Sequence, residues 1–172
     1  MKRRDVLKLT AAAPASVLAN AATQSAPAAA WKPLLFDDHQ NQTVVALCDL
    51  IIPATGTPGA KAALVNRHLD RLLHDGPVET QQRLLEGLAW LDGFAIRRHG
   101  HPFARCTPVE QTAMLEALEA GVEDGVGTGQ RFFRMAKTLI ASTYYATEIG
   151  VKELNKAGRV PPGFGCSHGS HV

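Results

Sequence analysis

The stretch QRFFRMAKTLIASTYYATE, at residues 130–148, contains the pattern that decides the fold. Its apolar residues recur three and four positions apart, so they fall on one side of an α-helix. The side that we expect to be buried consists of Phe132, Phe133, Ala136, Leu139, Ile140, Thr143 and Tyr144. Gly150 follows closely and is expected to end this helix, because glycine commonly occupies the position just after the last helical turn.

Other stretches show the same helical periodicity. The expected helices cover about residues 39–52, 60–74 and 79–98, and a further helix begins at TPVE, residues 107–110. In that motif Thr107 can cap the helix, Pro108 suits the first helical position and Glu110 completes a capping box. In the expected helix 60–74, the apolar side is formed by Leu64, Val65, His68, Leu69 and Leu72.

The remaining segments are rich in glycine and proline. Residues 121–129 hold four glycines and are expected to form a loop, and the chain beyond about residue 156 has no helical periodicity. We find no internal repeat and no convincing pair of strands. The sequence therefore predicts an all-α fold of about five helices with a long irregular C-terminal tail. One domain at residues 31–172 accounts for the chain that follows the first thirty residues.

Residues 1–30 have the composition of a cleavable signal peptide. A basic start is followed by a modestly apolar stretch and then by a run of small residues. Within it, Arg3 and Arg4, followed by Val6, Leu7 and Lys8, match the twin-arginine export signal R-R-x-[V/F]-L-K. The alternatives are an ordinary secretory signal or a basic helix start. Cleavage is expected after an A-x-A pattern, at residues 19–21 or 28–30.

The charge balance changes once this segment is set aside. The whole chain has 18 Lys and Arg against 16 Asp and Glu, but residues 1–30 hold four of the basic residues and one of the acidic ones. The remaining 14 basic and 15 acidic residues leave a nearly neutral domain. Such a domain is a poor binder of nucleic acid, and it has no polybasic cluster for anionic lipid. The signal predicts a periplasmic location, where disulfides are permitted.

No catalytic or metal-binding motif stands out. The chain lacks G-x-S-x-G, His-Glu-x-x-His and a complete phosphate-binding loop. His68, on an apolar helix side, is expected to be a packed core histidine. Cys166, His168 and His171 form the best ligand cluster, but the flanking glycines and the chain end give it no rigid support. We therefore predict no catalytic, cofactor-binding or metal-binding residue, and keep a metal-binding tail as the alternative.

The three cysteines differ in their expected surroundings. Cys48 lies in the middle of an apolar helix side and is expected to be an inert core residue. Cys106 precedes a helix N-cap, a position that can lower the pKa of a thiol. In an oxidising compartment Cys106 and Cys166 are candidates for an internal disulfide, which would close a loop of about 60 residues. A bridge to a partner chain and two free thiols remain as alternatives.

Two segments carry a resemblance to a known family. They are DLIIPATGTPGAKAALVNRHLD at residues 49–70, and YYATEIGVKEL at residues 144–154 with Gly165 and Cys166 after it. Together with the twin-arginine signal, they resemble the gluconate 2-dehydrogenase subunit 3 family, over nearly the whole chain beyond the signal. Ala146 departs mildly from the pattern, where Thr-Ser-Glu-like residues are expected.

The resemblance implies a non-catalytic small subunit of a membrane-associated, flavin-dependent sugar or sugar-acid dehydrogenase. In such complexes the large subunit carries FAD and a multihaem cytochrome c subunit carries haem, while the small subunit carries no cofactor. The small subunit supports the folding of the flavoprotein and its export by the twin-arginine translocase, which places the complex in the periplasm at the inner membrane. The competing interpretation is an independent periplasmic metal- or haem-binding protein that uses the C-terminal Cys/His tail.

Overall fold

The computed structural model describes residues 31–121 and 127–156. The chain divides into two units, Met1–Trp31 and Lys32–Val172, and the fold below is that of the second unit. Its described residues form helices only, which confirms the all-α prediction. The elements are α1 (Asp38–Ile51), α2 (Val65–His74), α3 (Val78–His99), the 3-10 turn η1 (Phe103–Arg105), α4 (Pro108–Ala120), α5 (Gly127–Ala146) and α6 (Glu148–Asn155). None of the described helices is long and apolar enough to cross a membrane.

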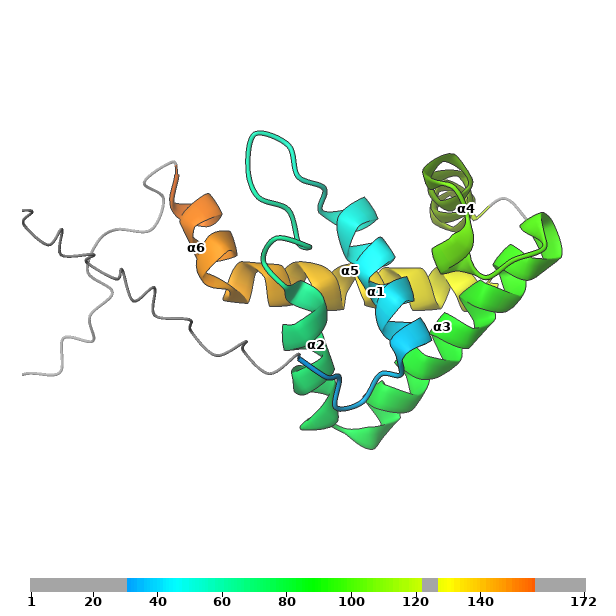
Figure 1. Cartoon of the computed structure of the whole chain (residues 1–172), viewed down its shortest axis with the longest axis horizontal. Coiled ribbons are helices and arrows are strands. Elements are labelled where there is room, and N and C mark those ends of the chain that lie inside the picture. The colour runs from blue at the N-terminus through cyan, green and yellow to red at the C-terminus, as the bar shows by residue number, and fades with distance from the viewer. Residues whose placement is uncertain (1–30, 122–126, 157–172) are drawn as a thin grey trace, which may run out of the picture. The chain divides into compact units, whose positions relative to one another are not determined.

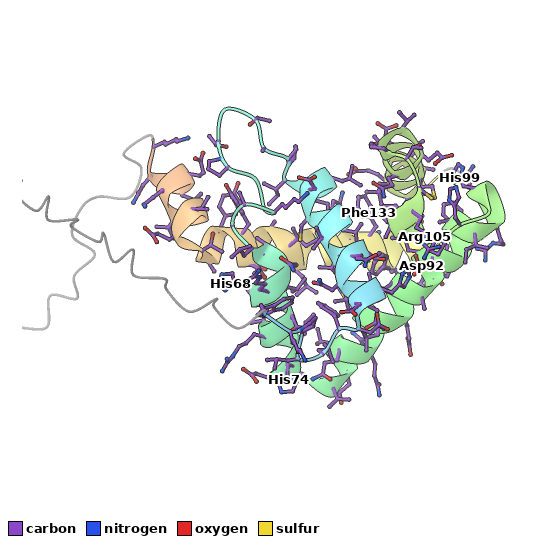
Figure 2. The ribbon with its side chains drawn as sticks, viewed as in Figure 1. His68, His74, Asp92, His99, Arg105 and Phe133 are labelled. Atoms are coloured by element: carbon purple, nitrogen blue, oxygen red, sulfur yellow. The ribbon has the colours of Figure 1, made fainter. Side chains whose placement is uncertain are left out.

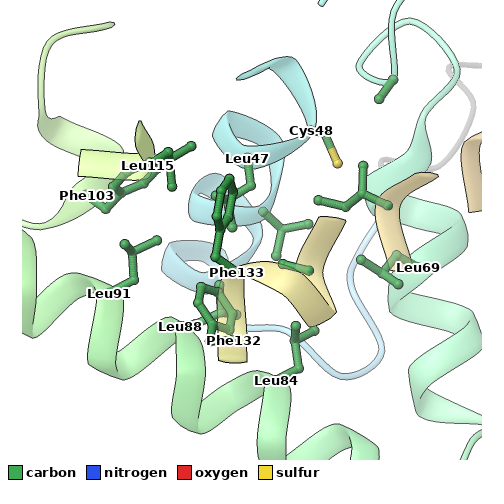
Figure 3. Packing of buried hydrophobic residues seen from close by; sticks show 14 of the residues in the cluster. Leu47, Cys48, Leu69, Leu84, Leu88, Leu91, Phe103, Leu115, Phe132 and Phe133 are labelled. Carbon is green, nitrogen blue, oxygen red and sulfur yellow. The ribbon is translucent and has the colours of Figure 1, made fainter. Parts of the chain in front are cut away.

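Helix α5 is the centre of the packing (Figure 1). It contacts α1, α2, α3, α4 and α6, whereas the other helices have fewer neighbours. Its buried side includes Phe132, Phe133, Ala136, Ile140, Thr143 and Tyr144, as the periodicity predicted, and Leu139 is half-buried. Figure 3 shows Phe132 and Phe133 between leucines of α1, α3 and α4. The sequence of α5 thus brings the other elements into one core.

Capping hydrogen bonds fix the starts of two helices. The predicted capping box of α4 is present, because the Glu110 carboxylate accepts from the Thr107 amide at 2.8 Å and Thr107 Oγ1 accepts from the Glu110 amide at 3.4 Å. A second capping box, at Asp37 and Gln40, starts α1 and was not predicted. These contacts satisfy backbone donors that the first turn of a helix leaves unpaired.

Helix α2 is shorter than predicted, and its buried side is rotated. The predicted start at residue 60 is wrong: residues 60–64 form a turn, and Leu64 takes a left-handed conformation with φ of 53°. This turn folds onto the end of α1, where the Ala60 amide donates to the Ile52 carbonyl at 2.9 Å. The buried residues of the helix are Val65, Asn66, Leu69, Asp70 and Leu73. His68 is therefore exposed, not packed in the core as predicted.

Asp70 on α2 holds the segment that leads into α1. Its carboxylate accepts hydrogen bonds from three successive backbone amides, those of Leu34 at 2.7 Å and of Leu35 and Phe36 at 3.0 Å. Asp70 is only 1% exposed, so these amides replace the water that the carboxylate loses on folding. The contact fixes residues 34–36 against α2 and buries the Phe36 side chain in the core.

Helix α5 begins earlier than predicted. The loop expected at residues 121–129 is wrong for its last three residues, since the helix starts at Gly127. Glycine is needed at position 129 of the helix, because a β-carbon there would lie 2.1 Å from Trp90 Cζ3 and 2.9 Å from Leu118 Cδ2. Only a residue without a side chain allows α5 to approach α3 and α4 this closely.

Gly150 lies inside a sixth helix rather than ending the fifth, which corrects the predicted boundary. Helix α5 ends at Ala146, and α6 begins after Thr147, whose Oγ1 accepts from the Gly150 amide at 3.1 Å and donates to the Tyr144 carbonyl at 2.7 Å. A β-carbon on Gly150 would lie 2.0 Å from the Tyr144 carbonyl oxygen. The glycine therefore permits the sharp turn between the two helices.

We predict that Asp70→Asn destabilises the fold. The amide has one accepting oxygen for three backbone donors, and hydrogen bonds to charged groups are worth more than neutral ones, so the free energy of unfolding should fall by about 2 kcal/mol. Urea denaturation of the purified chain measures the change. Asp75→Asn, at an exposed residue of the same carboxylate type, is the control, and equal effects of the two variants would contradict the role given to Asp70.

A matched pair of glycines on α3 tests the packing against α5. A β-carbon on Gly87 would lie 1.9 Å from the Phe132 ring, whereas the nearest atom to one on Gly93 is a terminal nitrogen of Arg97 at 3.5 Å. We expect Gly87→Ala to cost about 1–3 kcal/mol through overpacking. Gly93→Ala should instead stabilise the chain by up to about 1 kcal/mol, since alanine is the better helix former. Urea denaturation of both variants measures whether the free energy of unfolding falls for Gly87→Ala and rises for Gly93→Ala.

Candidate functional site

The residues of the predicted export signal lie outside the described residues. These are Arg3, Arg4, Val6, Leu7 and Lys8. The same holds for the C-terminal cluster of Cys166, His168 and His171. The proposed pairing of Cys106 with Cys166 therefore stays a prediction, as do the signal and the alternative of a metal-binding tail.

Cys106 occupies a closed environment just before α4. It is buried, and its sulfur lies 3.5 Å from His101 Nδ1 and 3.6 Å from the Pro102 carbonyl oxygen. Burial raises the pKa of the Cys106 thiol, and the nearby carboxylates of Glu110 and Asp92 raise it further. The lowered pKa suggested by its position near a helix start is therefore wrong, because desolvation and negative charge favour the neutral thiol.

Cys48 is a core residue, as predicted. It is 1% exposed on the buried side of α1 (Figure 3). Burial raises the pKa of its thiol to about 12, with a smaller contribution from the charge of Asp49. Because the thiolate is the reactive form, burial favours the unreactive thiol at Cys48.

Two histidine–carboxylate pairs join elements that are distant in the sequence. His39 Nε2 lies 2.6 Å from Asp92 Oδ2, and the other oxygen of Asp92 accepts from the Phe103 amide at 3.0 Å. These contacts tie α1 and η1 to α3. No sequence pattern indicates this pair, because its members are 53 residues apart and have no local motif.

The second pair, His99 and Glu110, joins α3 to α4 with His99 Nδ1 3.3 Å from Glu110 Oε1. Hydrogen bonds from Thr107 are the main cause that lowers the pKa of Glu110, and the nearby His99 and His101 lower it further. Figure 2 places His99 and Asp92 on α3, away from His68 and His74 on α2. Over the described ranges, no group of three or more His, Cys, Asp or Glu side chains is arranged to hold a metal ion.

An open hollow with a volume of about 700 Å³ lies between α2 and the C-terminal part of α5. Residues at its wall include His68, Leu72, Ser142, Thr143, Ala146 and Thr147. Leu72 is 54% exposed beside it. The hydroxyl of Thr143 is buried and has no hydrogen-bond partner among the described residues. The Arg71–Asp75 ion pair, 3.4 Å apart, forms part of the rim. An apolar contact surface of this kind suits the binding of another molecule.

Comparison with known families identifies the chain. The model of the family described as gluconate 2-dehydrogenase subunit 3 matches residues 38–163. This chain belongs to the gluconate 2-dehydrogenase subunit 3 family. The match begins at the first residue of α1 and extends beyond α6, so all the described helices of this subunit-3 protein lie within it. A search of curated proteins finds no match, and neither does a search of solved structures.

The family match confirms the resemblance seen in residues 49–70 and 144–154. Membership of the family makes this chain a subunit of a gluconate 2-dehydrogenase complex. The first of these segments covers the end of α1, the turn at Gly59 and Ala60, and the first half of α2. The second covers the junction of α5 and α6. Both contain close backbone contacts, at Gly59 and Gly150, in which a larger residue would clash with the backbone.

We predict that Cys48 of the folded chain is nearly inert to alkylation. With a pKa of about 12, roughly one thiol in ten thousand is ionised at pH 8, and burial also blocks access. Iodoacetamide labelling followed by peptide mass spectrometry should show Cys48 unmodified in the native chain and fully modified in urea. Equal labelling rates in the two conditions would contradict its assignment to the core.

Proposed function

We propose that this chain is the non-catalytic small subunit of a flavin-dependent sugar-acid dehydrogenase of the gluconate type. The observation that carries the proposal is the family match over residues 38–163. The surroundings of the two described cysteines support it, because burial raises the pKa of each thiol and favours its unreactive form. We infer that the oxidation takes place on the large subunit, with FAD as its cofactor, and that a multihaem cytochrome c subunit accepts the electrons.

The proposed task of the chain is to support the folding of the flavoprotein and to carry it across the membrane. Residues 3–8 contain the twin-arginine pattern. The twin-arginine translocase exports proteins that are already folded, so one signal on a small subunit serves a large partner that has bound its cofactor. On this proposal the assembled complex works in the periplasm, at the inner membrane. The substrate class is a sugar or sugar acid.

The export of the partner provides the test. We expect Arg3→Lys with Arg4→Lys to leave both this chain and the dehydrogenase activity in the cytoplasm, because the translocase reads the arginine pair. Gluconate-dependent dye reduction in periplasmic and cytoplasmic fractions measures the outcome. Arg97→Lys with Arg105→Lys makes the same chemical change at two exposed positions of the folded domain and should leave the distribution unchanged. Normal periplasmic activity in the signal variant would refute shared export.

A further inference from the structure

Helix α5 has an accessible stripe along one edge of its buried side. Its members are spaced three or four residues apart and are exposed or half-buried: Thr128, Arg131, Met135, Leu139, Ser142 and Ala146. This spacing keeps them in one line along the 20 residues of the helix. The same spacing is typical of the contact line between two packed helices.

Three open hollows follow this stripe from one end of α5 to the other. The first, of about 540 Å³, lies beside α3 and includes Thr128, Arg131 and Met135 in its wall. The second, of about 360 Å³, continues along Met135 and Leu139. The third is the hollow of about 700 Å³ beside α2 already described, which includes Ser142 and Ala146. Figure 1 shows α5 running from α3 at one end to α2 and α6 at the other. The three hollows are lined by successive parts of this helix, from Thr128 to Ala146.

The hollows at the two ends of the stripe differ in chemistry. At the α2 end, the exposed Leu72 offers an apolar contact, and the half-buried Leu139 offers another in the neighbouring hollow. Apolar side chains of a partner that fill these hollows would be removed from water, which favours binding.

At the α3 end the hollows are basic. The exposed guanidinium groups of Arg83, Arg131 and Arg134 lie in their walls, with Glu86 as the acidic residue beside them. Arg131 donates to Thr128 Oγ1 at 3.1 Å. Among the ion pairs of the described residues, none involves these three arginines. The excess positive charge is complementary to carboxylates on a partner.

We propose that the α5 stripe is the docking site for a helix of the catalytic subunit, with acidic residues facing Arg131 and Arg134 and apolar residues facing Leu139 and Leu72. The proposal rests on the proposed function, which supplies the partner. The length and spacing of the stripe suit a helix of the catalytic subunit. The arginines set the direction of that helix, because they attract its acidic end toward α3.

Charge reversal tests the basic end. The full-length chain, affinity-tagged and produced in its own organism with the other subunits, is used to capture the catalytic subunit, identified by mass spectrometry and by gluconate-dependent dye reduction. We expect Arg131→Glu with Arg134→Glu to lower its recovery about tenfold or more. Lys61→Glu with Lys152→Glu makes the same change in net charge at exposed residues away from the stripe, and should leave recovery unchanged. Circular dichroism of both variants checks that the helices are retained.

A photo-crosslinking residue in place of Ser142 tests which molecule occupies the apolar end. Crosslinks to the catalytic subunit support the proposal. Crosslinks only to residues 157–172 of this chain, or to a second copy of it, would overturn the proposal. Equal recovery of the catalytic subunit with both charge-reversal variants would also overturn it while leaving the proposed function intact. Failure of the unmodified chain to recover any dehydrogenase subunit would instead count against the proposed function.

Discussion

The fold depends on how closely α5 can approach its neighbours. At Gly87 on α3, the ring of Phe132 occupies the space that a β-carbon would need. At Gly129 on α5, the ring of Trp90 and a methyl group of Leu118 occupy that space. These two contacts let one helix reach α3 and α4 with large aromatic side chains between them. Protein interiors are close-packed, so the glycines determine the helix positions as firmly as the aromatic residues do.

Polar side chains then fix the elements that hydrophobic packing alone would leave loosely placed. Asp70 receives three backbone amides and holds the segment before α1, while Asp92 joins His39 and the Phe103 amide to α3. Each of these carboxylates satisfies donors that are far away in the sequence. These side chains therefore hold the elements of the domain against one another.

This organisation is consistent with a chain whose part in the dehydrogenase complex is structural. The described cysteines are buried, with the pKa of each thiol raised, whereas the accessible stripe of α5 lies beside apolar hollows and beside arginines that take part in no ion pair among the described residues. A binding surface of this kind contributes contact area and charge to a partner. It requires a stable scaffold beneath it, which the tightly packed inner side of α5 provides.

The sequence by itself determined the helical class, the capping box at Thr107, the core position of Cys48 and the family, because periodicity, capping and motifs are local. It misjudged α2, since the left-handed turn at Leu64 rotates the helix and exposes His68 while burying Asp70. It also placed Gly129 in a loop and Gly150 at a helix end, whereas both lie within helices at positions where neighbouring residues leave no room for a side chain. Only the tertiary structure decides these cases, because the partners of Asp70, His39 and Gly129 come from distant parts of the chain.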